Sequence, residues 1–79
     1  MVFCKLLKKN DGNGVYSFGD TVTNMSGEIV FYNGEPGFAV KKQPDNSYVA
    51  RNWIIKLYAK YSADFRNSVF REKLSYQCG

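Results

Sequence analysis

The side chains that could do chemistry in this chain are two cysteines, eleven lysines and arginines, and seven acids; histidine is absent. Histidine is the most frequent general base, so its absence removes Ser–His and Cys–His catalysis. The acids fall mostly in or beside expected turns, and no spacing guarantees that two of them converge. A chain of 79 residues would also struggle to enclose a substrate pocket of several hundred cubic ångströms. We therefore expect a protein that is not an enzyme.

The two cysteines, Cys4 and Cys78, lie near opposite ends of the chain. Two cysteines without histidine cannot complete a zinc site, so we expect neither a metal nor a cofactor. If the last strand pairs with the first so that Cys4 faces Cys78, their α-carbons would lie about 4.5–5.5 Å apart, within reach of a disulfide. That arrangement would be a redox-sensitive staple. We favour the alternative, two small buried hydrophobic residues in a reducing compartment.

Positive charge is the second feature of the chain that could support a function. The net charge of +4 permits attraction to polyanions without requiring it. Five lysines fall on two expected strands and are possible polyanion-binding residues: Lys5, Lys8, Lys9, Lys41 and Lys42.

Aromatic residues make up 16% of the chain and interleave with these lysines. Exposed rings on a sheet could stack bases while the lysines hold phosphates, which makes nucleic-acid binding the alternative function. The candidate rings are Tyr16, Phe18, Tyr32 and Tyr48. A solvated surface with ordinary strand aromatics accounts for the same composition and is the more common arrangement.

The elements that must position these residues are strands and one helix. Alternating apolar residues between Gly- and Asn-rich turns predict strands over 2–9, 15–18, 27–32, 38–42 and 73–78. Apolar residues at three- and four-residue spacing predict a helix over 47–66, capped by Asp45, Asn46 or Ser47.

The fold class that this order predicts is α+β: a four- to five-stranded, mainly antiparallel sheet in the order β-β-β-β-α-β, with one long helix on one face. The whole chain, 1–79, forms a single domain. We expect the helix to bury one set of side chains, Trp53, Ile54, Leu57 and Tyr61, against another from the sheet, Leu6, Val15, Ile29, Phe31, Val40 and Leu74.

One apolar residue of the helix, Ile55, lies opposite this stripe, among Asn52, Ala59 and Ala63. Small neighbours around an exposed aliphatic side chain make a surface that a partner or a second copy could approach. Single exposed apolar residues are common, and that reading is the simpler one.

Several short segments resemble small uncharacterised proteins of Firmicutes: residues 15–19 (VYSFG), 25–29 (MSGEI), 42–44 (KQP) and 70–74 (FREKL). The resemblance implies a bacterial, cytoplasmic α+β protein and carries no activity or site residues with it.

The sequence predicts a protein without membrane contact and leaves two possible functions. No apolar run approaches the roughly 20 residues that span a bilayer, and the first residues lack the pattern of a signal peptide, so we expect a cytoplasmic protein without membrane contact. The first reading is a non-enzymatic interaction module that binds a protein partner or itself. The alternative is a nucleic-acid-binding domain that uses a basic, aromatic sheet face.

Overall fold

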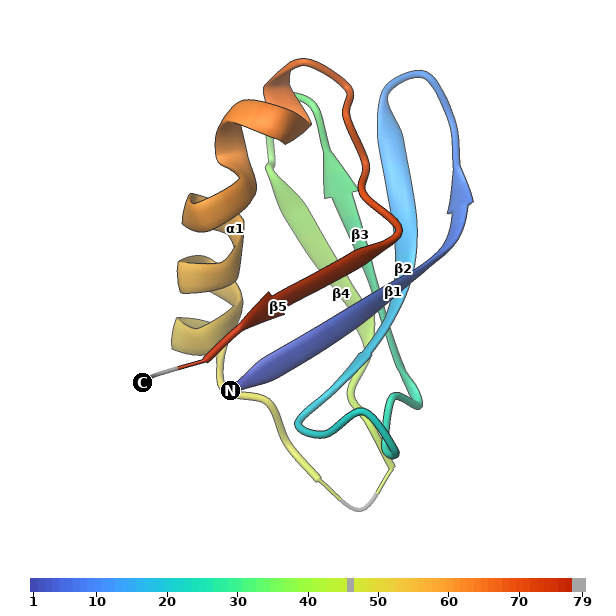
Figure 1. The fold of residues 1–79 in the computed structure, drawn as a ribbon, viewed down its shortest axis with the longest axis vertical. Coiled ribbons are helices and arrows are strands. Elements are labelled where there is room, and N and C mark those ends of the chain that lie inside the picture. The colour runs from blue at the N-terminus through green and yellow to red at the C-terminus, as the bar shows by residue number, and fades with distance from the viewer. Residues whose placement is uncertain (46, 78–79) are drawn as a thin grey trace.

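A computed structural model describes residues 1–45 and 47–77 of the chain. Five strands and one helix follow one another in the expected order (Figure 1). The elements are β1 (Val2–Lys9), β2 (Asn13–Gly19), β3 (Gly27–Tyr32), β4 (Phe38–Lys42), α1 (Arg51–Arg66) and β5 (Lys73–Tyr76).

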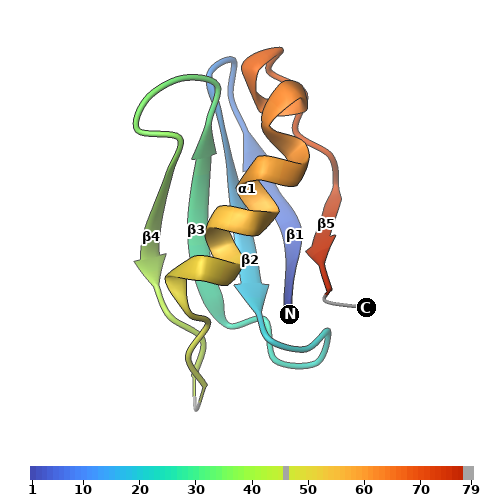
Figure 2. The same cartoon turned by 90° about the vertical axis from the view of Figure 1, so that its left-hand side faces the viewer.

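The strands form one sheet in the order β4-β3-β2-β1-β5, and every neighbouring pair is antiparallel. The first four strands are a meander, and α1 crosses one face to bring β5 back beside β1 (Figure 2). This arrangement confirms the predicted α+β class. We call the face under α1 the closed face and the opposite one the open face.

The closed face holds the hydrophobic core. Tyr16, Phe18, Ile29 and Phe31 are at most 1% exposed, and their strand partners bring them onto the same side of the sheet. From the helix, Phe65 stacks on Phe31 with ring centroids 4.7 Å apart. Ile54 and Leu57 are also buried, as predicted. Large aromatic rings let a small domain bury enough apolar area to fold.

Part of the predicted core is wrong. Val15 pairs with Val30 and lies on the open face, because the larger rings of its neighbours on β2 occupy the closed face. Val40 is 37% exposed near the edge of the sheet. Trp53 and Tyr61 are only half-buried at the flanks of the helix.

The helix begins four residues later than predicted, at Arg51. Its N-cap position is Ala50, which makes no side-chain cap, while Asn46 lies outside the described residues. The reason lies in Gln43, whose amide donates to the carbonyl of Val49 and accepts from its backbone N–H, at 3.2 and 3.0 Å. These two bonds, together with the burial of Val49, favour an extended segment where the sequence predicted a first helical turn.

The predicted pairing of the first and last strands is wrong by four residues. Cys4 lies opposite Leu74, not opposite Cys78, and Val2 lies opposite Tyr76. A shift by an even number keeps every side chain on its face, so the alternating pattern could not distinguish the two registers. Cys4 is a free thiol, and Cys78 lies outside the described residues.

Candidate functional site

The open face is a surface of the sheet that the fold leaves without a covering helix or strand. In the part of the chain that the structure describes, neither the helix nor another strand lies over it (Figures 1 and 2). One row of paired residues crosses the entire sheet on this face: Lys73, Lys5, Ser17, Glu28 and Lys42.

Two β-bulges determine which lysines reach the open face. Leu7 is an extra residue between the pairs Leu6–Tyr16 and Lys8–Val15, so Lys8 lies on the side of Val15. In β4 the extra residue is Lys41. Strict alternation would have placed Lys8 and the last lysine of β4 on the closed face. Bulges often re-aim a side chain in this way, and here they add two lysines to the open face.

The predicted polyanion-binding lysines therefore separate into two groups. Lys5, Lys8 and Lys42 share the open face. Lys9 pairs with Gly14 on the opposite side, and Lys41 occupies the bulge outside the ladder. A further lysine on this face, Lys73, was not singled out by sequence reasoning, because its place opposite Lys5 depends on the β1–β5 register.

Lys5 and Lys73 form an unusual like-charged pair. The N–H of Leu6 donates to the carbonyl of Glu72 at 2.8 Å, which makes those two residues a hydrogen-bonded pair. Because bonded and non-bonded pairs alternate, Lys5 and Lys73 face each other at a non-bonded position, with α-carbons about 4.5 Å apart. Like charges directly opposite destabilise a sheet. The ion pairs found among the described residues, Lys42–Asp45 and Arg71–Asp64, include neither lysine.

The loop after β2 stands beside this lysine pair and is fixed by Asn24. The Asn24 side-chain amide nitrogen lies 3.4, 3.2 and 3.1 Å from the carboxylate of Asp20, the carbonyl of Asp45 and the hydroxyl of Ser47, and its two N–H groups are shared among these three acceptors. Its own carbonyl accepts from Ser26 at 3.4 Å. One polar side chain thus ties the 20–26 loop to the segment that leads into the helix.

The same loop requires glycine at the residue before it, Gly19, which ends β2. A β-carbon on Gly19 would lie 1.6 Å from the backbone oxygen of Asn24, closer than any real contact. Only glycine allows the backbone to approach this closely.

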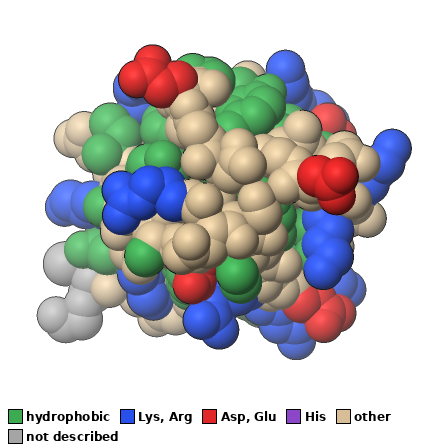
Figure 3. All heavy atoms as spheres, turned by 90° about the horizontal axis from the view of Figure 1, so that it is seen from above, with side chains coloured by type: hydrophobic (Ala, Val, Ile, Leu, Met, Phe, Trp, Pro, Cys, Tyr) green, Lys and Arg blue, Asp and Glu red, His purple; other side chains and the backbone are tan. Residues whose placement is uncertain are grey.

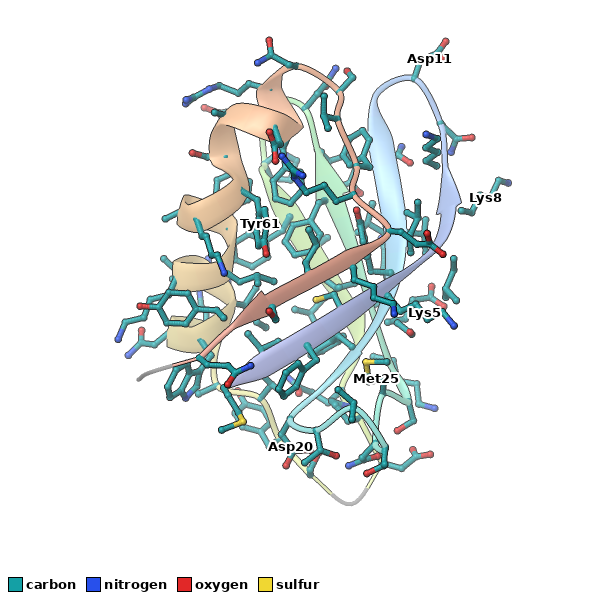
Figure 4. All side chains as sticks on the ribbon, in the orientation of Figure 1. Lys5, Lys8, Asp11, Asp20, Met25 and Tyr61 are labelled. Carbon is teal, nitrogen blue, oxygen red and sulfur yellow. The ribbon has the colours of Figure 1, made fainter. Side chains whose placement is uncertain are left out.

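A hollow of about 370 Å³ lies between the loop and the sheet. We call it the β1–β5 hollow. Its apolar lining includes Phe3, Val22 and Met25, and Lys5, Lys73 and Ser75 supply its polar part. Figure 4 shows Lys5 on β1 and Met25 on the loop on the same side of the ribbon. Val22 and Met25 were missed by sequence reasoning because nothing local indicates that the loop folds beside β1. The hollow is partly open to solvent, so it does not bear on the expectation that a chain of this length would struggle to enclose a pocket.

The candidate stacking rings are mostly unavailable. Tyr16 and Phe18 are fully buried on the closed face, so their predicted exposure is wrong. The Tyr16 hydroxyl donates to the carbonyl of Arg71 at 2.6 Å, and burial raises the pKa of Tyr16. Tyr32 is half-buried on the open face, and Tyr48 is 72% exposed in the loop before the helix.

The remaining predicted residues lie away from the hollow or are inert. Ile55 is 43% exposed on the outer side of α1, the opposite side of the molecule from the open face. Burial raises the pKa of the Cys4 thiol from 9.0 to about 12, so it stays protonated and unreactive near neutral pH. Among residues 1–45 and 47–77, no three His, Cys, Asp or Glu side chains gather as a metal site would require.

Comparison with models of known protein families, with curated proteins and with solved structures found no match to this chain. The resemblance to small Firmicutes proteins therefore stays a prediction. No helix of the described chain is long and apolar enough to cross a membrane.

Proposed function

We propose that this chain is a non-enzymatic interaction module that binds an acidic protein partner through the open face. The observation that carries the proposal is charge: four lysines of the strands share this face, with Glu28 as the acid in their row. Between them Val15 and Ala39 are half-buried, so some apolar surface lies among the lysines. The buried thiol of Cys4 agrees with a cytoplasmic setting.

The partner is better sought in a different protein than in a second copy. Two identical open faces related by a two-fold axis would bring lysines against lysines, which repel. Sedimentation across a wide concentration range tests this directly: a constant monomeric mass agrees with the proposal, and a mass that doubles would indicate self-association.

Nucleic-acid binding is the second candidate, favoured because the same lysines share one face. Its stacking platform is weak, since two of the four predicted rings are buried. Seen from above, Lys, Arg, Asp and Glu side chains are interspersed (Figure 3).

An amide NMR titration separates the two candidates. The probes are poly-glutamate and a mixed-sequence single-stranded RNA, each at low and moderate salt. We expect poly-glutamate to shift amides of the open-face strands, with shifts that fade as salt screens the lysines. A stronger RNA response on the same amides would favour the nucleic-acid candidate, with affinity falling steeply with salt.

Matched variants locate the surface. Lys8→Gln with Lys42→Gln removes two charges from the open face, whereas Lys56→Gln with Arg66→Gln removes two from exposed positions on the helix. We expect only the first variant to weaken the response to poly-glutamate. Equal losses in both would mean that net charge alone drives binding and would contradict an open-face site. Ile55→Ser tests the helix surface without changing the charge and should leave the response unchanged.

A further inference from the structure

We infer that the β1–β5 hollow is a binding site for an amphipathic organic anion, a small molecule with an apolar chain or ring that ends in a negatively charged group. This site is distinct from the broad surface of the proposed function, because it would take a ligand into a defined volume. The inference depends on three features of the hollow: its size, its lining and its unneutralised charge.

The size suits a small ligand. A volume of about 370 Å³ falls within the roughly 300–1,000 Å³ that ligand pockets occupy. Phe3, Val22 and Met25 offer apolar contact, and the thioether of a methionine adapts to different shapes. Val22 is 67% exposed, and contact with an apolar ligand would remove that surface from water.

The charge at the hollow is of one sign. Its lining contains Lys5 and Lys73 but neither aspartate nor glutamate. The two ammonium groups project from directly opposed positions, so their repulsion is a cost to the sheet that an anion between them would relieve. An apolar lining beside two adjacent cations matches a ligand that has an apolar part and, next to it, a negatively charged group.

The walls of the hollow are preorganised. Asn24 holds the loop that carries Val22 and Met25 through bonds to Asp20, Asp45 and Ser47. On the other side, the Tyr61 hydroxyl accepts from the N–H of Ser75 at 3.3 Å, and β5 is thereby tied to the helix. Walls fixed before binding reduce the ordering cost that a ligand must overcome.

The test is an amide NMR titration of the whole chain with octanoate, kept below its micelle concentration, alongside octanamide and acetate. We expect octanoate to shift amides of Phe3, Lys5, Met25 and their neighbours. It should bind roughly tenfold or more tightly than acetate, because acetate lacks the buried chain. Octanamide, which lacks the charge, should bind more weakly than octanoate.

Variants test the lysine pair. Lys5→Gln with Lys73→Gln should weaken octanoate binding by roughly threefold to tenfold, in line with the loss of two exposed ion pairs. Lys8→Gln with Lys41→Gln removes the same charge outside the hollow and should leave affinity within about twofold. Lys73→Glu is the sharpest variant, because it replaces repulsion by attraction across the strands. It should raise the urea midpoint while it weakens octanoate binding, so lost binding could not be ascribed to misfolding.

Four outcomes would overturn the inference: no shifts up to the solubility limit, shifts away from the hollow, equal affinity for octanoate and octanamide, or equal affinity for octanoate and acetate. Binding that survives in Lys73→Glu would likewise contradict a role for the pair. None of these outcomes bears on the poly-glutamate response of the Lys8 and Lys42 side of the open face, so the proposed function stands or fails separately.

Discussion

On the closed face of the sheet, side chains alternate regularly and meet a helix; on the open face, the alternation is interrupted twice and the surface faces solvent. Tyr16, Phe18 and Phe31 are fully buried on the closed side. On the open side, bulges at Leu7 and Lys41 turn the following lysines outward. Regular alternation of side chains places the apolar residues in the core. The two bulges interrupt that alternation and place additional lysines on the open face, which packing of the core alone would not do.

The largest expected effect is on the closed face, at Leu57. Leu57→Ala removes a fully buried side chain beneath the helix and should lower the free energy of unfolding by roughly 2–5 kcal/mol. Ile55→Ala, on the exposed side of the same helix, is the control and should cost at most about 0.5 kcal/mol. Urea unfolding measures both. Similar losses for the two variants would mean that the helix face is assigned wrongly.

Alkaline pH should weaken the closed face through Cys4. Its folded pKa of about 12 lies above the ordinary 9.0, so above pH 9 the unfolded chain loses the thiol proton before the folded chain does. Stability from this group is fully present below about pH 9 and is lost as the pH rises toward 12. The slope is at most about 1.4 kcal/mol per pH unit.

Comparing wild type with Cys4→Ala isolates this contribution, since lysine titration is common to both. The difference in unfolding free energy between them should shrink as the pH rises above 9. Burial also raises the pKa of Tyr16. Both proteins therefore keep the part of the pH dependence of stability that comes from Tyr16. A difference that stays constant would contradict the burial of the thiol.

Asn24 should show how much the open-face loop depends on one side chain. Asn24→Ala removes the bonds that hold the 20–26 loop, and several part-buried hydrogen bonds of about 1 kcal/mol each suggest a loss of roughly 1–3 kcal/mol. Asn33→Ala, which loses a single exposed bond to Ser68, should cost about 0.5 kcal/mol or less. Amide exchange should accelerate in the loop but not in β2 or β3. Protection that is unchanged across the loop would show that other contacts hold it.

The sequence predicted the elements well but the two faces of β2 poorly, since Tyr16 and Phe18 lie in the core and Val15 lies on the open face. Apolar periodicity located all five strands and the helix, because burial imposes that periodicity. The bulges, the start of the helix at Arg51 and the β1–β5 register depend on particular side-chain and strand contacts and not on apolar periodicity. Gln43 with Val49 and Lys5 with Lys73 are such contacts, and no local pattern contains them. The hollow could not be predicted because it needs the register and the loop position together.

The smallest effect is expected from removing the bulge in β1. Deleting Leu7, which is 58% exposed, would bring Lys8 directly after Leu6. The pairs Leu6–Tyr16 and Lys8–Val15 would then be consecutive, so every side chain would keep its face. We expect a cost of about 1 kcal/mol or less, from the altered bend of the strand.

Deleting Lys5 instead is the control, because it removes a residue from the regular ladder. Residues on one side of the deletion must then change faces, which exposes Val2 and Cys4 or disrupts their pairing with β5. Urea unfolding and amide spectra should show a folded protein in the first case and a severely destabilised one in the second. If both deletions unfold the chain, the bend that the bulge gives β1 is itself required for the fold. Lys8 would then lie on the open face because the fold itself needs the bulge, and the bulge could not be removed without unfolding the chain.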